Sequence, residues 1–259
     1  MNLLQNSYAS FVNLDHRMDR RTHMLRELAR VNIQAERTKG RHPAEFSDPR
    51  FSVMRSRTPG AIGCYMSQIS IKQRALSLGK HAFVMEDDLV FCSDIHTRLD
   101  YISEWMEKNE WDVFWLGGTF HSPAFWHPAG QSKMKPNCSA GIGKDCDKTN
   151  DIRIMRTYGA FSTHAYIVNH ISIQKVLDML DGVLHESIGI DWSYIKIQPK
   201  IKAFAFVPGC VKQYDNKSDI GTGITKYSGF AQLNGTLLNS TYWWQDKMEQ
   251  FNPQAFTWR

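Results

Sequence analysis

Three consecutive acids, Glu86, Asp87 and Asp88, follow directly on the apolar run AFVM. Carboxylates this close raise one another's pKa and destabilise a fold unless a cation or a basic side chain neutralises them. Oxygen ligands of this kind suit Mg²⁺ or Mn²⁺, which proteins often share with a substrate diphosphate. If strand geometry continues through the triplet, Glu86 and Asp88 point to one side and Asp87 to the other. The triplet indicates a cation and diphosphate site, with a solvated loop after a strand as the alternative.

A second polar cluster lies in the stretch FVNLDHRMDRR. Asn13 and Asp15 stand at the end of an apolar strand, and Arg17 and Arg20 follow them. Amide and carboxylate groups hydrogen-bond to a base or ribose, whereas guanidinium groups pair with phosphate. The stretch therefore suits a nucleotide, although a capped, basic helix start would explain the same residues.

Strands and helices alternate along the chain. Apolar runs predict strands at residues 8–14, 82–85, 112–117, 164–168 and 203–207. Apolar residues at helical spacing predict helices at residues 18–31, 61–79, 95–106, 172–180 and 191–197. This alternation favours an α/β fold with a mostly parallel sheet and helices on both faces. Ligands of such folds bind at the carboxyl ends of strands, which is where the acids stand.

The domain organisation follows from length and composition. A chain of 259 residues with 42% hydrophobic residues can bury one core, so a single domain over residues 1–259 is expected. Residues 119–157 are poor in aliphatic side chains and too long for a simple connection, which indicates a long loop insertion with a functional role. From about residue 208 the chain is expected to be irregular.

Charge and hydropathy exclude some classes of function. The formal charge is +5, and Lys and Arg are scattered, which argues against nucleic acid and favours small anionic ligands or weak attraction to an acidic membrane surface. No run approaches the roughly 18 to 20 apolar residues of a membrane span, and the amino terminus lacks a secretory pattern. We therefore expect a protein that is cytoplasmic or peripheral at a membrane.

The cysteines give little indication of a metal site. Cys138 and Cys146 lie in one polar loop and are candidates for a disulfide. With His121 and His127 they could form a zinc site, but the spacings lack the tight pairs of structural zinc.

Five stretches resemble the successive blocks of a known family, in order over residues 8 to 222. They are FVNLDHRMDRR, PGAIGCYMSQISIKQRAL, AFVMEDDLVF, WDVFWLG and KSDI. In this order, the five stretches resemble the blocks of glycosyltransferase family 25, which contains lipooligosaccharide galactosyltransferases and collagen galactosyltransferases. The resemblance implies a GT-A fold, a nucleotide-binding α/β sheet whose acidic motif holds Mn²⁺ or Mg²⁺ on the diphosphate of a nucleotide sugar.

The resemblance also implies roles for single residues. It implies metal ligands at Asp88, Glu86 and Asp219, and contacts to the nucleotide sugar at Asn13, Asp15, Arg17, Arg20, Gly63, Ser67, Glu86 and Asp87. Ala61 and Gln68 depart from the family, which usually has Glu and His at these positions. The two departures bear on the sugar donor more than on the fold.

The implied reaction is inverting transfer of a hexose, galactose or glucose, from a UDP-sugar to a hydroxyl of a glycan or glycoconjugate acceptor. A carboxylate must take the proton of the acceptor hydroxyl. Asp191, at an expected helix start in GIDWSYI, is the first candidate and Glu186 the reserve, while a plain helix cap would also explain Asp191. Lysines that could neutralise the leaving diphosphate are Lys212, Lys217 and Lys226.

Two other functions remain open. One is a catalytically silent glycan-binding or scaffold protein of the same fold. The presence of the acids Glu86, Asp87, Asp88 and Asp219 argues against it. The other is a nucleotidyltransferase or nuclease on a similar sheet, which should carry a further acid cluster or a lysine-rich phosphate loop that the sequence lacks.

Overall fold

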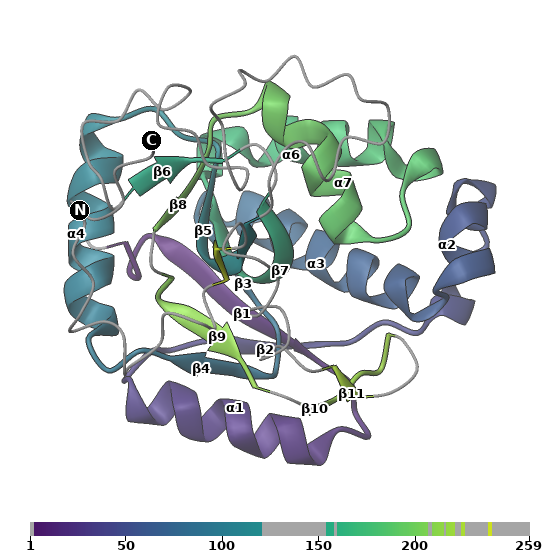
Figure 1. The fold of residues 1–259 in the computed structure, drawn as a ribbon, viewed down its shortest axis with the longest axis horizontal. Helices are drawn as coiled ribbons and strands as arrows, with labels where there is room; N and C mark the ends of the chain where they lie inside the picture. The colour runs from purple at the N-terminus through teal and green to yellow at the C-terminus, as the bar shows by residue number, and fades with distance from the viewer. Residues whose placement is uncertain are drawn as a thin grey trace.

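The computed structural model describes residues 3–120, 154–157, 160–206, 209–214, 216–220, 224–225 and 238–239. A central sheet has the strand order β2-β1-β3-β7-β5-β8-β6, and β12 pairs with β5 beside this path (Figure 1). Its strands are β1 (Ser7–Asn13), β2 (Glu36–Lys39), β3 (His81–Met85), β5 (Val113–Phe120), β6 (Ile154–Arg156), β7 (Ala160–Val168), β8 (Ala203–Phe206) and β12 (Leu238–Asn239). Two short pairs lie apart from it, β4 (Leu89–Phe91) with β9 (Val211–Gln213) and β10 (Asn216–Lys217) with β11 (Ile224–Thr225).

Most strands of the central sheet point the same way. β1 pairs in parallel with both β2 and β3, and β5 pairs in parallel with β8. β7 is antiparallel to both β3 and β5, so β5 and β8 run in the direction of β1, β2 and β3. β6 and β12 are antiparallel to their partners. The predicted α/β fold with a mostly parallel sheet is confirmed, and the reversed β7 in its middle is the feature that the apolar pattern did not reveal.

Helices cover both faces of the sheet (Figure 1). On one face lie α1 (Met18–Arg30) and α4 (Ile95–Lys108), whose apolar sides pack on residues such as Phe83 and Met85. On the other face lie α3 (Gly60–Ser77), α6 (Ile173–Gly182) and α7 (Ile190–Ile197), which pack on residues such as Val84. Neighbouring residues of β3 serve opposite cores because strand side chains alternate, and all five residues of β3 are buried. The shorter α2 (Ser52–Arg57) precedes α3.

Several elements were absent from the sequence-based expectations. β2 reads ERTK and β6 reads IMR, so neither has the apolar run that predicts a strand. β6 falls inside the stretch expected to be a loop insertion, and β9 and β10 fall inside the carboxy-terminal segment expected to be irregular. Such short strands form because a neighbouring strand offers them backbone partners, which a local pattern cannot show.

Some expectations concern residues outside the described ranges. These are the proposed Cys138–Cys146 disulfide, the zinc alternative with His121 and His127, and the diphosphate role of Lys226. Within the described ranges, no helix has the length and apolar character needed to cross a membrane.

Candidate functional site

A cavity of about 420 Å³ opens at the carboxyl ends of β1 and β3. Its walls come from these two strand ends, the loop after β2, the start of α3 and residues 218–220. Eight of the residues predicted from sequence line it: Asn13, Arg20, Gly63, Ser67, Glu86, Asp87, Asp88 and Asp219. Asp15, Arg17 and Asp191 do not line it. The structure therefore gathers in one place most of the residues selected from widely separated stretches.

The three acids form the turn between β3 and β4. β3 ends at Met85, and the backbone N–H of Glu86 donates to the carbonyl of His164 at 2.9 Å. Because the chain turns here, strand alternation does not continue through the triplet, and all three acids line the same cavity.

Asp87 is the meeting point of the two polar clusters. Phe11 and Met85 are the last residues paired between β1 and β3, and Asn13 and Asp87 each follow two residues later. Asn13 Nδ2 donates to Asp87 Oδ2 at 2.6 Å, and Arg20 Nη1 donates to Asp87 Oδ1 at 2.9 Å. Burial nevertheless raises the pKa of Asp87, because it outweighs these two stabilising partners.

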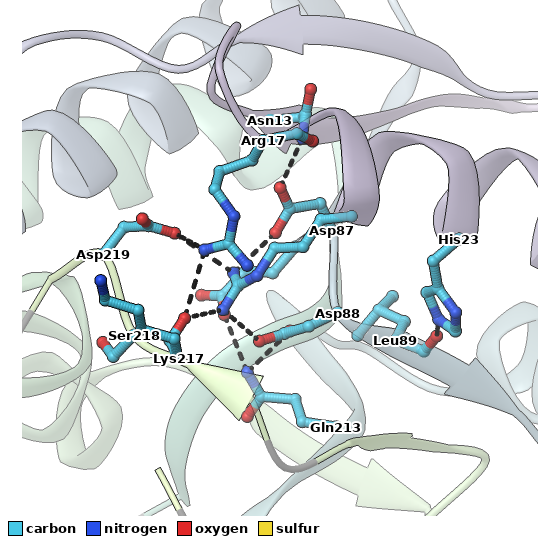
Figure 2. A network of polar contacts seen from close by, with 12 residues as sticks. Asn13, Arg17, His23, Asp87, Asp88, Leu89, Gln213, Lys217, Ser218 and Asp219 are labelled. Carbon is cyan, nitrogen blue, oxygen red and sulfur yellow. Dashed lines mark hydrogen bonds and ion pairs between the residues drawn. The ribbon is translucent and has the colours of Figure 1, made fainter. Parts of the chain in front are cut away.

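Arg20 contacts more than one acid of the cavity. Its Nη2 lies 3.5 Å from Asp88 Oδ2, and its Nη1 lies 3.9 Å from Asp219 Oδ2. Figure 2 shows Asp87, Asp88 and Asp219 pointing toward one central region of this network. A guanidinium of α1 is therefore the shared counter-charge of these three carboxylates.

Residues 216–220, which we term the strap, close one side of the cavity. Arg17 donates to the carbonyl of Lys217 at 3.2 Å and pairs with Asp219 (Figure 2). Arg20 donates to the same carbonyl at 2.9 Å. A Cβ on Gly60 would lie 2.9 Å from the carbonyl oxygen of Asp219, so α3 can approach the strap only where it carries no side chain. Arg17 does not line the cavity itself, but it forms an ion pair with Asp219, which does. Of the lysines predicted to meet a diphosphate, Lys217 and Lys212 do not line the cavity.

Glu86 is held by two amides. Gln68 Nε2 lies 3.3 Å from Glu86 Oε1, and Gln213 Nε2 lies 3.0 Å from Glu86 Oε2. Gln213 Nε2 also donates to Asp88 Oδ1 at 3.0 Å. Burial, followed by the charges of Asp88, Asp191 and Asp87, raises the pKa of Glu86 well above its ordinary value.

Asp191 lies in the first turn of α7, outside the cavity lining. Its Oδ1 accepts a hydrogen bond from Thr163 Oγ1 at 2.7 Å, and Thr163 Oγ1 in turn accepts one from Gln68 Nε2 at 3.1 Å. Burial raises the pKa of Asp191. The reserve candidate, Glu186, is an exposed residue paired with Lys196 at the surface. Of the two candidate bases, Asp191 is the one linked to the cavity by hydrogen bonds.

The wall beside α3 depends on Gly63 and Ser67. A Cβ on Gly63 would lie 2.2 Å from the carbonyl oxygen of Arg41, so this close approach requires glycine. Ser67 Oγ accepts from the N–H of Arg41 at 2.9 Å and donates to the carbonyl of Gly63 at 2.6 Å. Both residues fix the loop after β2 against the helix.

Asp15 supports the site from outside. It is exposed and pairs with Lys39 at 2.8 Å and with Arg37, and these partners lower the pKa of Asp15 to about 2. Arg37 in turn donates to the side-chain and backbone oxygens of Asn13, both at 3.0 Å. Asp15 therefore orients Arg37, and Arg37 in turn orients the side chain of Asn13.

The described residues do not form a ready set of metal ligands. Glu86, Asp87, Asp88 and Asp219 each already contact an amide or guanidinium N–H, and no group of three His, Cys, Asp or Glu side chains in the described ranges converges as a metal site. Inner-sphere binding would require these carboxylates to exchange partners. The predicted Mn²⁺ or Mg²⁺ ligation by Asp88, Glu86 and Asp219 stays a prediction.

Sequence reasoning missed several residues of this site. Gln213 and Thr163 sit in stretches with no local motif, and Arg41 follows a short strand that the sequence did not predict. Gln68 was noted as a departure from a family pattern, without its role as the residue joining Glu86 to Thr163. Only the pairing of distant strands places these side chains together.

A second cavity, of about 440 Å³, lies beside His81, Trp111 and Lys175, away from the acid triplet. Its buried acid, Asp112, already accepts hydrogen bonds from Ser172, Lys175 and the backbone N–H of Lys202. We therefore place the functional site at the cavity with the acid cluster.

Residues 9–188 match the sequence model described as glycosyltransferase family 25 (LPS biosynthesis protein). The match spans well over half of the chain and includes most of β1, all of α3 and the acid triplet. The chain belongs to glycosyltransferase family 25. The suspected resemblance is confirmed, and with it the general activity of a glycosyltransferase. Of the site residues of this family 25 protein, Asp191, Gln213 and Asp219 lie beyond the matched range. A search of curated proteins found no match to the chain.

Proposed function

We propose that the protein transfers a hexose, galactose or glucose, from a UDP-sugar to a hydroxyl of a lipopolysaccharide or related glycoconjugate, with inversion at the anomeric carbon. The observation that supports this most is the cavity at the carboxyl ends of β1 and β3. Within it, the acid triplet, Asn13 and the glycine-lined start of α3 meet. Ligands of α/β sheets bind at this edge.

The charge of the cavity bears on how a diphosphate would bind. The lining contains four acids, Glu86, Asp87, Asp88 and Asp219, and two arginines, Arg20 and Arg41. With histidines neutral, its formal charge is −4 + 2 = −2. When all four acids are ionised, this surface would repel a diphosphate unless a cation accompanied it. A divalent cation, Mn²⁺ or Mg²⁺, carried in with the sugar donor therefore remains part of the proposal.

The proton of the acceptor hydroxyl would pass to Asp191. In a direct displacement, the acceptor oxygen forms a bond to the anomeric carbon while the bond from that carbon to the diphosphate breaks. The hydroxyl proton moves to the carboxylate. The raised pKa of Asp191 makes it a better base than an exposed carboxylate, provided that the pH keeps it ionised.

A donor screen tests the proposal. UDP-galactose, UDP-glucose, GDP-mannose and a CMP-sugar would each be added to the protein with Mn²⁺, with Mg²⁺ or with EDTA, and the Tm and donor hydrolysis measured. We expect UDP-hexoses to raise the Tm most and to be hydrolysed slowly. Failure of every nucleotide sugar to raise the Tm would refute the proposal. Stabilisation without hydrolysis or transfer would favour a catalytically silent glycan-binding protein.

A further inference from the structure

Glu86 differs from the other acids of the cavity in what holds it. Asp87, Asp88 and Asp219 each lie within ion-pair distance of Arg20. The two oxygens of Glu86 instead accept hydrogen bonds from the neutral amides of Gln68 and Gln213. A carboxylate oxygen has two lone pairs, so each oxygen of Glu86 can accept one more hydrogen bond.

The Gln68 amide has a fixed orientation. Gln68 is fully buried, and its Oε1 accepts from the hydroxyl of Tyr166 at 2.7 Å. Its Nε2 faces two acceptors, Glu86 Oε1 at 3.3 Å and Thr163 Oγ1 at 3.1 Å. A flipped amide would turn its oxygen toward the carboxylate and its N–H groups toward the tyrosine, which loses favourable contacts in a buried place.

The Gln213 amide comes from a separate part of the chain. Gln213 lies on β9, opposite Leu89 of β4, which begins directly after the acid triplet. It is 6% exposed, and its Nε2 bridges Glu86 Oε2 and Asp88 Oδ1, at 3.0 Å each. The two amides therefore approach Glu86 from α3 and from β9 and restrict the rotation of its carboxylate.

We propose that Gln68 and Gln213 are positioning residues that hold Glu86 as the acceptor of a hydrogen bond from a hydroxyl of the donor hexose. This inference rests on the proposed function, since it assigns the sugar end of the donor site. Sugar hydroxyls donate to carboxyl oxygens, and each oxygen of Glu86, with one lone pair taken by an amide N–H, has a second lone pair for such a hydroxyl. The acids paired with Arg20 would lie toward the diphosphate.

A chain of hydrogen bonds from Glu86 to Asp191 supports placing the sugar at Glu86 and the diphosphate at the acids paired with Arg20. Gln68 contacts both Glu86 and Thr163, and Thr163 donates to Asp191, the proposed base. The sugar must lie at the end of the donor nearest the base, because the acceptor attacks its anomeric carbon. Glu86 is the acid of the triplet that this chain connects to Asp191.

The test separates binding of the sugar from binding of the nucleotide. The Kd values of UDP and of a UDP-hexose would be measured by calorimetry for the wild type, Gln68→Met and Gln213→Met. Gln198→Met is the matched control, because Gln198 is also fully buried and hydrogen-bonded, to Thr157 and Ala160, but does not line the cavity. Glu86→Gln, alone and combined with Gln68→Met, completes a double-mutant cycle between Glu86 and Gln68.

We expect Gln68→Met to weaken UDP-hexose binding about tenfold, the effect of one lost hydrogen bond, while UDP binding changes less than twofold. Glu86→Gln should cause a similar selective loss, and the double variant should lose little more, because both changes remove one interaction. Gln198→Met should lower the Tm and leave both Kd values unchanged.

The proposal is overturned if Gln68→Met weakens UDP and UDP-hexose equally, if Gln198→Met reproduces its effect, or if the Glu86 and Gln68 losses simply add. Wild-type protein that binds neither ligand would instead refute the proposed function. Binding of UDP by the wild type, with no further gain from the hexose, would refute the sugar contact alone. Should Gln68→Met not fold, Gln213→Met and Glu86→Gln carry the same comparison.

Discussion

Arg20 of α1 and Asp87 of the β3–β4 turn form an ion pair of 2.9 Å that is almost closed to solvent, with side chains 11% and 8% exposed. The pair joins the basic stretch after β1 to the acid triplet after β3, which are 67 residues apart in sequence. It is the contact by which the two polar clusters become one site.

Removing the guanidinium should destabilise the protein strongly. In Arg20→Ala, Asp87 and Asp88 would keep their burial and lose a cation, which typically costs about 3 kcal/mol or more. Urea unfolding at pH 7 measures the change in free energy. Arg26→Ala, on an exposed position of the same helix, is the control and should stay within about 0.5 kcal/mol of the wild type. Equal stability of the two variants would show that the pair is unimportant.

A buried lysine should make stability depend on pH. The amine of Lys72 contacts the carbonyl of Gln68 at 3.2 Å and the rings of Tyr166 and Tyr194, and burial lowers its pKa from 10.5 to about 7. Between these values the unfolded chain binds one more proton than the folded chain, so this group makes stability rise with pH by about 1.4 kcal/mol per unit.

Lys72→Met should remove that dependence. The variant's free energy of unfolding should exceed that of the wild type most below pH 7, where a charged lysine is buried, and the difference should shrink toward pH 10. Urea unfolding of both proteins at several pH values gives the difference. A constant difference across pH 7 to 10 would contradict the lowered pKa.

A methyl group added at Gly63 should displace one wall of the cavity. In Gly63→Ala the new Cβ would overlap the carbonyl of Arg41, so the loop after β2 must move away from α3. We expect the affinity for a UDP-hexose to fall about tenfold or more, equivalent to about 1.4 kcal/mol, measured by calorimetry. Gly182→Ala, where a Cβ meets nothing within 4 Å, should bind as the wild type does. Unchanged binding by Gly63→Ala would place the ligand elsewhere.

Much of the fold could be predicted from local pattern. The buried runs of β1, β3 and β5 and the amphipathic faces of α1 and α4 carry their own periodicity, because each buries one side against the sheet. β2 and β6 lack such a signal, since ERTK and IMR become strands only through neighbours that offer backbone hydrogen bonds.

The grouping of the candidate residues could be predicted where it depends on strand ends, and it was missed where it depends on long-range pairing. The acids and Asn13 follow apolar runs, so their place at the sheet edge could be predicted. Gln213 contacts Glu86, 127 residues away in sequence, because β4 pairs with β9. The sequence next to Gln213 contains no pattern that predicts this contact. The contact of Arg20 with phosphate stays a prediction, whereas the structure shows Arg20 paired with Asp87 and Asp88.

The most direct test of the central claim is UDP-hexose hydrolysis by the wild type and by Asp88→Ala, with released UDP measured over time in the presence of Mn²⁺. Asp88 is buried, lines the cavity and joins Arg20 and Gln213. We predict that the wild type hydrolyses the donor and that Asp88→Ala is slower by at least about tenfold, equivalent to about 1.4 kcal/mol in the barrier. A variant that hydrolyses the donor as fast as the wild type would contradict the assignment of this cavity as the donor site.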